Sequence, residues 1–301
     1  MKQLTVISGK GGTGKTSLVA AFAQCAAPAV LADCDVDASN LPILLQPIGE
    51  SRSEPFTSGY FVKLDPSLCD GCRICEEVCR FGAVEFETAE GGTGDALPRF
   101  DYYACEGCGA CVDACPPGAI ALVERVSGTL YVSRMRYGPL VHAELGIAEG
   151  MSGKLVTMVR ERATEIAERE GLDLVLVDGS PGIGCPVIAS MAGVDAVLIV
   201  TEPTVAGRHD LDRIAELTQH FRITSAAIVN KFDLNIAMTE EIEEACRARG
   251  IRPLGRIGFD PVFVKAMVEG KTVLEYADGE IGSNLRRLWE RMMGLMQGAG
   301  G

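Results

Sequence analysis

Short apolar runs separated by longer amphipathic stretches indicate an α/β protein. Continuous runs rich in Val, Ile, Leu and Ala occur at 4–7, 29–32, 172–178, 196–201 and 226–229. Uninterrupted runs of this length are typical of parallel strands that are buried on both faces. Stretches with helical character lie between them, at 17–23, 153–170 and 210–220. The alternation predicts a doubly wound, mostly parallel sheet with helices on both faces.

The first apolar run leads directly into a glycine-rich segment that contains two lysines. Residues 9–16, Gly-Lys-Gly-Gly-Thr-Gly-Lys-Thr, match the pattern G-x-x-x-x-G-K-[ST] and precede a predicted helix. This strand–loop–helix order is typical of a phosphate-binding loop, in which glycines let successive backbone N–H groups face a polyphosphate. We expect Lys15 to contact the β- and γ-phosphates and the Thr16 hydroxyl to ligate Mg²⁺.

Acidic residues follow two of the predicted strands at the end where parallel sheets place their chemistry. Asp33 and Asp35 come after the run 29–32, and Asp178 closes the run 172–178. A buried strand that ends in an acid beside a phosphate-binding loop indicates a Walker B carboxylate, so we expect Asp178 to hold Mg²⁺ through water.

Eight of the twelve cysteines lie between about residues 57 and 124, where the α/β pattern is interrupted. They form two runs with the same spacing, C-x-x-C-x-x-C-x-x-x-C, at Cys69, Cys72, Cys75 and Cys79, and at Cys105, Cys108, Cys111 and Cys115. The repeated spacing indicates an internal repeat whose thiolates bind metal.

Composition and charge argue against several classes of protein. The net charge of −13 argues against a nucleic-acid partner, which would need a basic face. No apolar run reaches the 18 residues of a membrane span. The first residues enter a strand without the charged and apolar regions of a secretory signal, so we expect a cytoplasmic protein. In that reducing compartment the cysteines are expected to be metal ligands rather than disulfides.

The phosphate-binding loop resembles the deviant Walker A motif of the MinD/Mrp/ParA group and the nitrogenase iron protein, because Lys10 gives the pattern KGGxGKT. The resemblance implies an ATPase that works as a homodimer, with ATP in the interface and Lys10 reaching the partner's nucleotide. It further implies that Asp33 lies near Mg²⁺ with Thr16 and Asp178, that Asp35 orients the attacking water, and that Lys10 and Lys15 are catalytic. ATP contacts are expected from Gly9, Lys10, Gly11, Gly12, Thr13, Gly14, Lys15, Thr16, Ser17 and Asn230.

The cysteine runs resemble a bacterial two-cluster ferredoxin, in which the fourth cysteine of each run ligates the other cluster. The resemblance implies one 4Fe–4S cluster on Cys69, Cys72, Cys75 and Cys115 and a second on Cys79, Cys105, Cys108 and Cys111. Structural zinc is the rival, but it has no use for eight interleaved ligands. Arg80 replaces the usual proline after Cys79, and Gly91–Gly94 lies in a long link that we expect to be an exposed turn.

The expected architecture is an ATPase domain in two parts, 1–57 and 125–301, around an inserted α+β ferredoxin-like domain at 58–124. We expect ATP hydrolysis to be coupled to electron transfer to a partner protein or to metal-cluster assembly on it. The alternative is a MinD-like positioning or scaffolding ATPase whose clusters only stabilise a docking module. The amphipathic segment 284–297 is expected to dock on the protein rather than bind membrane. Cys185 is left open between a buried thiol and a redox role.

Overall fold

The computed structural model describes residues 1–86, 97–146, 152–277 and 279–298. The chain divides into two compact units. Unit 1 comprises residues 1–54, 130–145 and 151–301, and unit 2 comprises 55–129 and 146–150. Each unit is described by itself.

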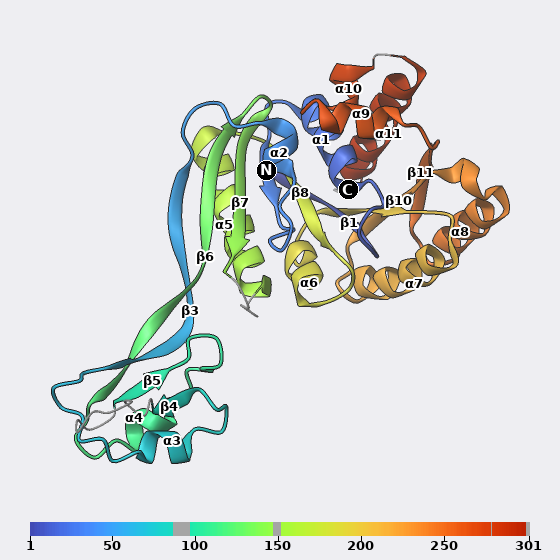
Figure 1. The fold of residues 1–301 in the computed structure, drawn as a ribbon. Helices are drawn as coiled ribbons and strands as arrows, with labels where there is room; N and C mark the ends of the chain where they lie inside the picture. The colour runs from blue at the N-terminus through green and yellow to red at the C-terminus, as the bar shows by residue number, and fades with distance from the viewer. Residues whose placement is uncertain (87–96, 147–151, 278, 299–301) are drawn as a thin grey trace. The chain divides into compact units, whose positions relative to one another are not determined.

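Unit 1 is built on a parallel sheet (Figure 1). Seven strands pair in the order β11-β10-β9-β1-β8-β2-β7, and every one of these pairings is parallel. Their bounds are β1 Lys2–Ser8, β2 Val30–Asp33, β7 Gly138–Leu145, β8 Leu174–Pro181, β9 Ala196–Thr201, β10 Thr224–Asn230 and β11 Arg252–Ile257. The predicted parallel sheet is therefore confirmed, and β7 and β11 are strands that the apolar runs did not indicate.

Two long strands extend the sheet beyond β7. They are β6, Ile120–Met135, and β3, Arg52–Leu64, which take the last two places in the sheet order. Only two residues, 136–137, connect β6 to β7, so this pair is an antiparallel hairpin. The division between the units falls inside β3 and β6. The expected domain limits at 57/58 and 124/125 also fall inside these two strands.

Helices cover both faces of the sheet because successive side chains of the central strands point to opposite sides. In β1, Leu4 and Val6 belong to one core and Ile7 to the other. The first core packs under α1 Lys15–Ala26, α2 Leu41–Leu45, α9 Val262–Val268, α10 Val273–Tyr276 and α11 Glu280–Gly298. The opposite face carries α5 Ser152–Glu170, α6 Cys185–Met191, α7 Val205–His220 and α8 Ile236–Ala248 (Figure 1).

The C-terminal helix α11 is docked on unit 1. Its apolar side chains Leu285, Leu288, Trp289 and Met292 are buried, and the Trp289 ring lies 5.2 Å from the ring of Phe22 in α1. The helix therefore presents its apolar stripe to the core, as expected from its sequence. No helix in the described ranges is long and apolar enough to span a membrane.

Unit 2 has a small core. Its regular elements are the antiparallel pair β4 Val84–Phe86 and β5 Pro98–Phe100, the short helices α3 Ile74–Val78 and α4 Ala110–Asp113, and the adjoining parts of β3 and β6. Among its described residues, the buried members of its core cluster are Val62, Cys75, Ala83, Val84, Cys105 and Ile120. Two of these six are cysteines of the repeated runs. The predicted turn at Gly91–Gly94 lies outside the described residues.

Candidate functional site

The glycine-rich loop lies at the carboxyl end of β1, between β8 on one side and β9 on the other. The strands that follow β1 in the chain lie on both sides of it, with β2 on the side of β8, and β9 and β10 on the other side. The carboxyl end of β1 therefore lies where the strand order reverses, which is the switch point at which doubly wound sheets bind ligands. The loop ends at Lys15, where α1 begins, so the positive N-terminal end of the helix faces the same edge.

Close packing explains two glycines of the loop. Gly14 has φ +87°, in the left-handed region, and a Cβ there would lie 2.5 Å from Nδ2 of Asn230. A Cβ on Gly9 would lie 2.2 Å from Cβ of Asp210 in α7. The Asn230 amide also donates a 2.7 Å hydrogen bond to the Thr13 carbonyl. Side chains from β10 and α7 thus hold the loop, and neither leaves room for a side chain on these glycines.

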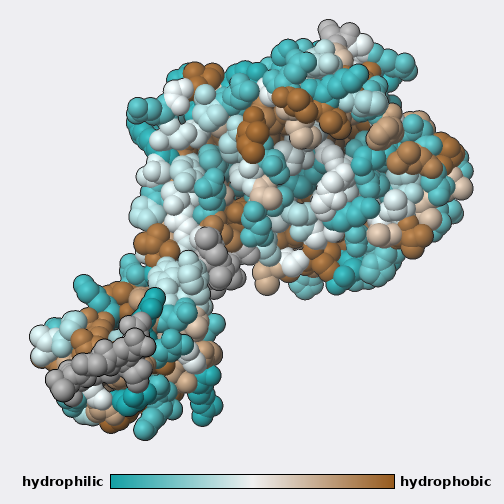
Figure 2. Space-filling model, in the orientation of Figure 1, coloured by the Kyte–Doolittle hydropathy of each residue, from teal (hydrophilic) through white to brown (hydrophobic). Residues whose placement is uncertain are grey.

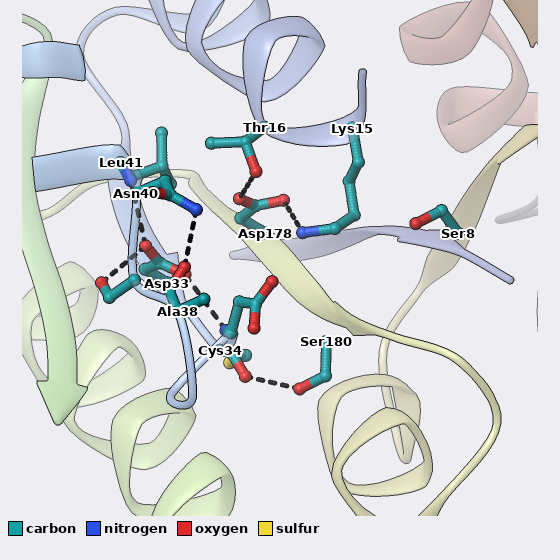
Figure 3. A network of polar contacts seen from close by, with 12 residues as sticks. Ser8, Lys15, Thr16, Asp33, Cys34, Ala38, Asn40, Leu41, Asp178 and Ser180 are labelled. Atoms are coloured by element: carbon teal, nitrogen blue, oxygen red, sulfur yellow. Dashed lines mark hydrogen bonds and ion pairs between the residues drawn. The ribbon is translucent and has the colours of Figure 1, made fainter. Parts of the chain in front are cut away.

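Asp178 connects the two residues that follow Gly14. Its Oδ1 accepts a 2.6 Å bond from the Lys15 ammonium, and its Oδ2 accepts a 2.8 Å bond from the Thr16 hydroxyl (Figure 3). Burial by itself would lower the pKa of Lys15, but the charge of Asp178 and this hydrogen bond raise it above its ordinary value. Lys15 is therefore held as a buried cation beside Asp178 and Thr16, two of the three residues that are predicted to bind Mg²⁺.

Asp33 stabilises the loop that follows β2. Its side chain is fully buried and accepts hydrogen bonds from Ser39 Oγ at 2.7 Å and from the backbone N–H groups of Asp35 and Leu41 (Figure 3). Burial, and then the negative charge of Asp178, raises the pKa of Asp33 to about 7. Asp33 thus shapes the segment that presents Asp35, whereas its Mg²⁺ role stays a prediction.

A cavity of about 590 Å³ opens beside the loop, within the size range of small-molecule sites. It is lined by residues 11–14 of the loop and by the polar residues Lys15, Thr16 and Asp35, and Ile43 and Met267 are among its apolar lining residues. Ser180, from the end of β8, also lines it and donates a hydrogen bond to the Cys34 carbonyl (Figure 3). This hydrogen bond joins the end of β8 directly to the segment that follows β2.

Three predicted nucleotide ligands do not line this cavity: Gly9, Lys10 and Asn230. Gly9 packs on α7 and Asn230 binds the Thr13 carbonyl, as described above. Lys10 forms a 3.0 Å ion pair with Glu202, at the start of the turn after β9. Sequence reasoning gave no role to Glu202, although its position directly after a buried strand at the ligand-binding edge was an available signal.

Unit 2 gathers the eight cysteines of the repeated runs into two groups around two small cavities. The first cavity is lined by Cys69, Cys72, Cys75 and Cys115. The second is lined by Cys79, Cys105, Cys108 and Cys111. In each group three cysteines come from one run and the fourth comes from the other. These are the groups that the ferredoxin resemblance implies.

The two halves of unit 2 also repeat their backbone contacts. The N–H groups of Ala83 and Ala119 point at Sγ of Cys79 and Cys115, at 3.4 and 3.3 Å. Asp65 and Asp101, each four residues before the first cysteine of its run, donate their N–H groups to the Ala119 and Ala83 carbonyls. The sequence repeat is therefore a structural repeat in which each half contacts the other.

The remaining cysteines lie in unit 1. Cys34 and Cys246 are buried and Cys25 is half-buried, whereas Cys185 is exposed at the first residue of α6. Cys185 is therefore not the buried thiol that was one of the two alternatives left open for it. Across the described parts of the chain, no three His, Cys, Asp or Glu side chains lie close enough together to hold a single metal ion.

With these sites described, comparison with known proteins gives the family. The family model for the CobQ/CobB/MinD/ParA nucleotide binding domain matches residues 4–273. This chain belongs to that family. The family accounts for the parallel sheet and makes this chain a member of a group of nucleotide-binding ATPases.

Two known proteins match most of the length of this chain. Two relatives from Methanocaldococcus jannaschii are the uncharacterized proteins MJ0578 and MJ0579. MJ0578 is 33% identical over 77% of this chain and 79% of its own length. MJ0579 is 27% identical over 92% of this chain and 93% of its own length.

Solved structures with the same fold include MinD and ParA proteins. The MinD cell division protein of Aquifex aeolicus has a TM-score of 0.55 at 17% identity, covering 98% of this chain and 97% of that one. The MinD of Pyrococcus horikoshii complexed with Mg-ADP has a TM-score of 0.54 at 16% identity, covering 99% and 98%. A ParA family ATPase from Chlorobium tepidum has a TM-score of 0.56 at 16% identity, covering 96% and 98%. At these identities the likeness concerns the fold.

Proposed function

We propose that this family member is an ATP-hydrolysing iron–sulfur protein. Its ATPase cycle would be coupled to electron transfer to a partner protein or to metal-cluster assembly on it. The observation that carries the proposal is the interleaved arrangement of eight cysteines around two cavities in a chain whose family binds nucleotide. A nucleotide site alone would fit many family members, whereas the cysteine groups call for redox or cluster chemistry.

The proposed ATP chemistry uses the residues around Asp178. Thr16 and Asp178 would hold Mg²⁺, since their oxygens already lie 2.8 Å apart. Lys15 would then exchange its bond to Asp178 for the β- and γ-phosphates of the bound triphosphate. Asp35, half-exposed on the cavity wall, would orient the attacking water. Lys10 of a second subunit would neutralise charge that develops on the phosphates, in the manner of an arginine finger.

The cysteine groups fit two 4Fe–4S clusters in number, origin and surroundings. A four-iron cluster is wider than one ion, so its thiolates stand around a cavity rather than converge as the ligands of one ion do. Apolar side chains line both cavities, including Phe86 and Ile120 in the first and Val62 and Phe100 in the second. Bound clusters would supply one-electron transfer, and these side chains would limit water around them.

Two measurements test the proposal. Protein purified without oxygen should contain about eight iron and eight sulfide per chain. Lys15→Ala should lower ATP hydrolysis by roughly 100-fold or more, because it removes the cation that faces the transferred phosphate. Lys63→Ala, which changes an exposed lysine of β3 in unit 2, is the matched control and should keep normal turnover.

The coupling itself is tested by measuring ATP turnover with the clusters oxidised, chemically reduced and removed. We expect turnover to differ between these states. Identical turnover in all three would contradict the coupling and favour a positioning or scaffolding ATPase with a cysteine-rich docking module. Iron-free protein after anaerobic purification would contradict the iron–sulfur assignment itself.

A further inference from the structure

Glu202 binds two lysines at once. Its Oε2 lies 3.0 Å from the Lys10 ammonium, and its Oε1 pairs with the Lys231 ammonium. The Glu202 side chain is only 10% exposed, whereas the Lys10 side chain is 38% exposed. A single, nearly buried carboxylate therefore lies between two cations, one of which is the lysine proposed to act on the neighbouring subunit.

The backbone around Lys10 is held so that its side chain meets Glu202. Ser8 Oγ donates a 2.9 Å hydrogen bond to the Lys10 carbonyl, and Gly9 packs directly against Asp210 of α7. Since α7 begins at Val205, just after Glu202, the same junction of β9 and α7 positions both the loop and the carboxylate. The Lys10–Glu202 ion pair thus follows from the packing of the loop against α7.

Lys231 attaches the carboxylate to the other half of the loop. Besides pairing with Glu202, its ammonium donates a 3.1 Å bond to the Gly12 carbonyl. Its neighbour Asn230 binds the next carbonyl, that of Thr13. The end of β10 therefore holds the middle of the loop while Glu202 holds its early lysine.

We propose that Glu202 is a positioning residue that keeps Lys10 bound within its own subunit and releases it when the ATP-bound dimer forms. The proposal rests on the role proposed above for Lys10 in the partner's nucleotide site. Lys10 is engaged in its own subunit in this structure, so it must leave Glu202 before it reaches another subunit. Dimerisation therefore competes with the Lys10–Glu202 pair.

Lys231 keeps the free-energy cost of releasing Lys10 small. A buried carboxylate left without a cation would be costly, but Glu202 keeps Lys231 when Lys10 departs. What is lost is one partly exposed ion pair, of the kind that contributes little in solution. We therefore expect Glu202 to weaken dimerisation by only about two- to five-fold.

The first test measures Lys10 directly. Nucleotide-free wild-type protein and the Glu202→Gln variant are pulsed with an amine-acylating ester, and modification of Lys10 is quantified by mass spectrometry. Loss of the ion pair should raise Lys10 modification several-fold. Glu243→Gln is the matched control, because Glu243 is a carboxylate of similar exposure, 12%, that also binds two cations, Arg247 and Arg256, on α8 and β11. Unchanged Lys10 modification in Glu202→Gln would overturn the proposal.

The second test measures dimerisation with Mg-ATP by analytical ultracentrifugation. Glu202→Gln should dimerise at a two- to five-fold lower protein concentration than wild type, and the gain should vanish when Lys10→Ala is also present. An equal gain on the Lys10→Ala background would overturn the proposal, because Glu202 would then act without Lys10. If wild type does not dimerise with ATP, the proposed function fails instead, and the labelling result still decides whether Glu202 holds Lys10.

Discussion

Unit 1 and unit 2 are held together in different ways. Unit 1 encloses its sheet between two helix layers, with long apolar side chains such as Leu4, Phe22 and Leu176 completely buried. Among the described residues of unit 2, the core cluster has six members, and two of them, Cys75 and Cys105, belong to the repeated cysteine runs. Figure 2 shows apolar groups on the visible surface of each unit, but among the described residues the core of unit 1 is far larger than that of unit 2. A core as small as that of unit 2 does not usually sustain a fold without metals or disulfides.

The nucleotide site of unit 1 and the cysteine groups of unit 2 differ in what each needs in order to form. The nucleotide site is assembled by the fold of unit 1, since Asp178, Lys15 and Thr16 are already hydrogen-bonded to one another. The cysteine groups surround cavities, so part of what stabilises unit 2 would come from whatever fills them. Ligand removal is therefore expected to affect the two units unequally.

The largest expected effect is on the folding of unit 2. Cys105→Ser removes one proposed cluster ligand that is also a core residue, and should lower bound iron by about half while raising amide hydrogen exchange across residues 58–124. Exchange in β1, β8 and β9 should stay slow. Cys185→Ser, an exposed cysteine in unit 1, is the control and should leave iron content unchanged. Equal loss of protection in both units would contradict the comparison.

A smaller effect is expected in unit 1 at acid pH. Burial lowers the pKa of His142, in β7, to about 4. Between its unfolded value near 6.5 and this value the unfolded chain binds more protons than the folded one, so stability should fall as the pH drops. The loss should reach on the order of 3 kcal/mol by pH 4. The loss of stability is measured by urea unfolding of the full chain at a series of pH values. His142→Gln should remove this part of the pH dependence. A variant with the same pH profile as wild type would contradict the assignment.

The smallest expected effect is on the reduction potential of the cluster at one of the two cysteine groups of unit 2. Arg125 donates a 3.1 Å hydrogen bond to the Cys105 carbonyl, and its guanidinium stacks on Tyr102 at 4.2 Å. A cation beside the second group stabilises a cluster there after it gains an electron, so it raises that reduction potential. Arg125→Met should lower one of the two potentials by a few tens of mV in an anaerobic EPR titration.

The control for this measurement is Lys63→Met, which removes an exposed cation of β3 whose side chain lines neither cysteine cavity. It should leave both potentials close to those of wild type. Two potentials that shift together in Arg125→Met would contradict a local effect at the second group.

The elements predicted from sequence were those whose signal is local. The run 196–201 is β9, and the helix expected at 153–170 is α5, Ser152–Glu170. A long apolar run or a helical period is visible within one element, so neighbours in space are not needed to recognise it. The strands β7 and β11 were missed because their runs are short or interrupted by Gly and Pro, as in Arg252–Ile257.

The sequence by itself determined the chemistry of each motif: which residues are glycines, which side chain is the loop lysine, and how the cysteines are spaced. These properties reside in residues that are adjacent in the chain. Tertiary structure alone decided that Lys10 meets Glu202 and that Asn230 holds the Thr13 carbonyl. Each of these contacts joins segments far apart in sequence, and only the packing of strands and helices brings such segments within hydrogen-bonding distance.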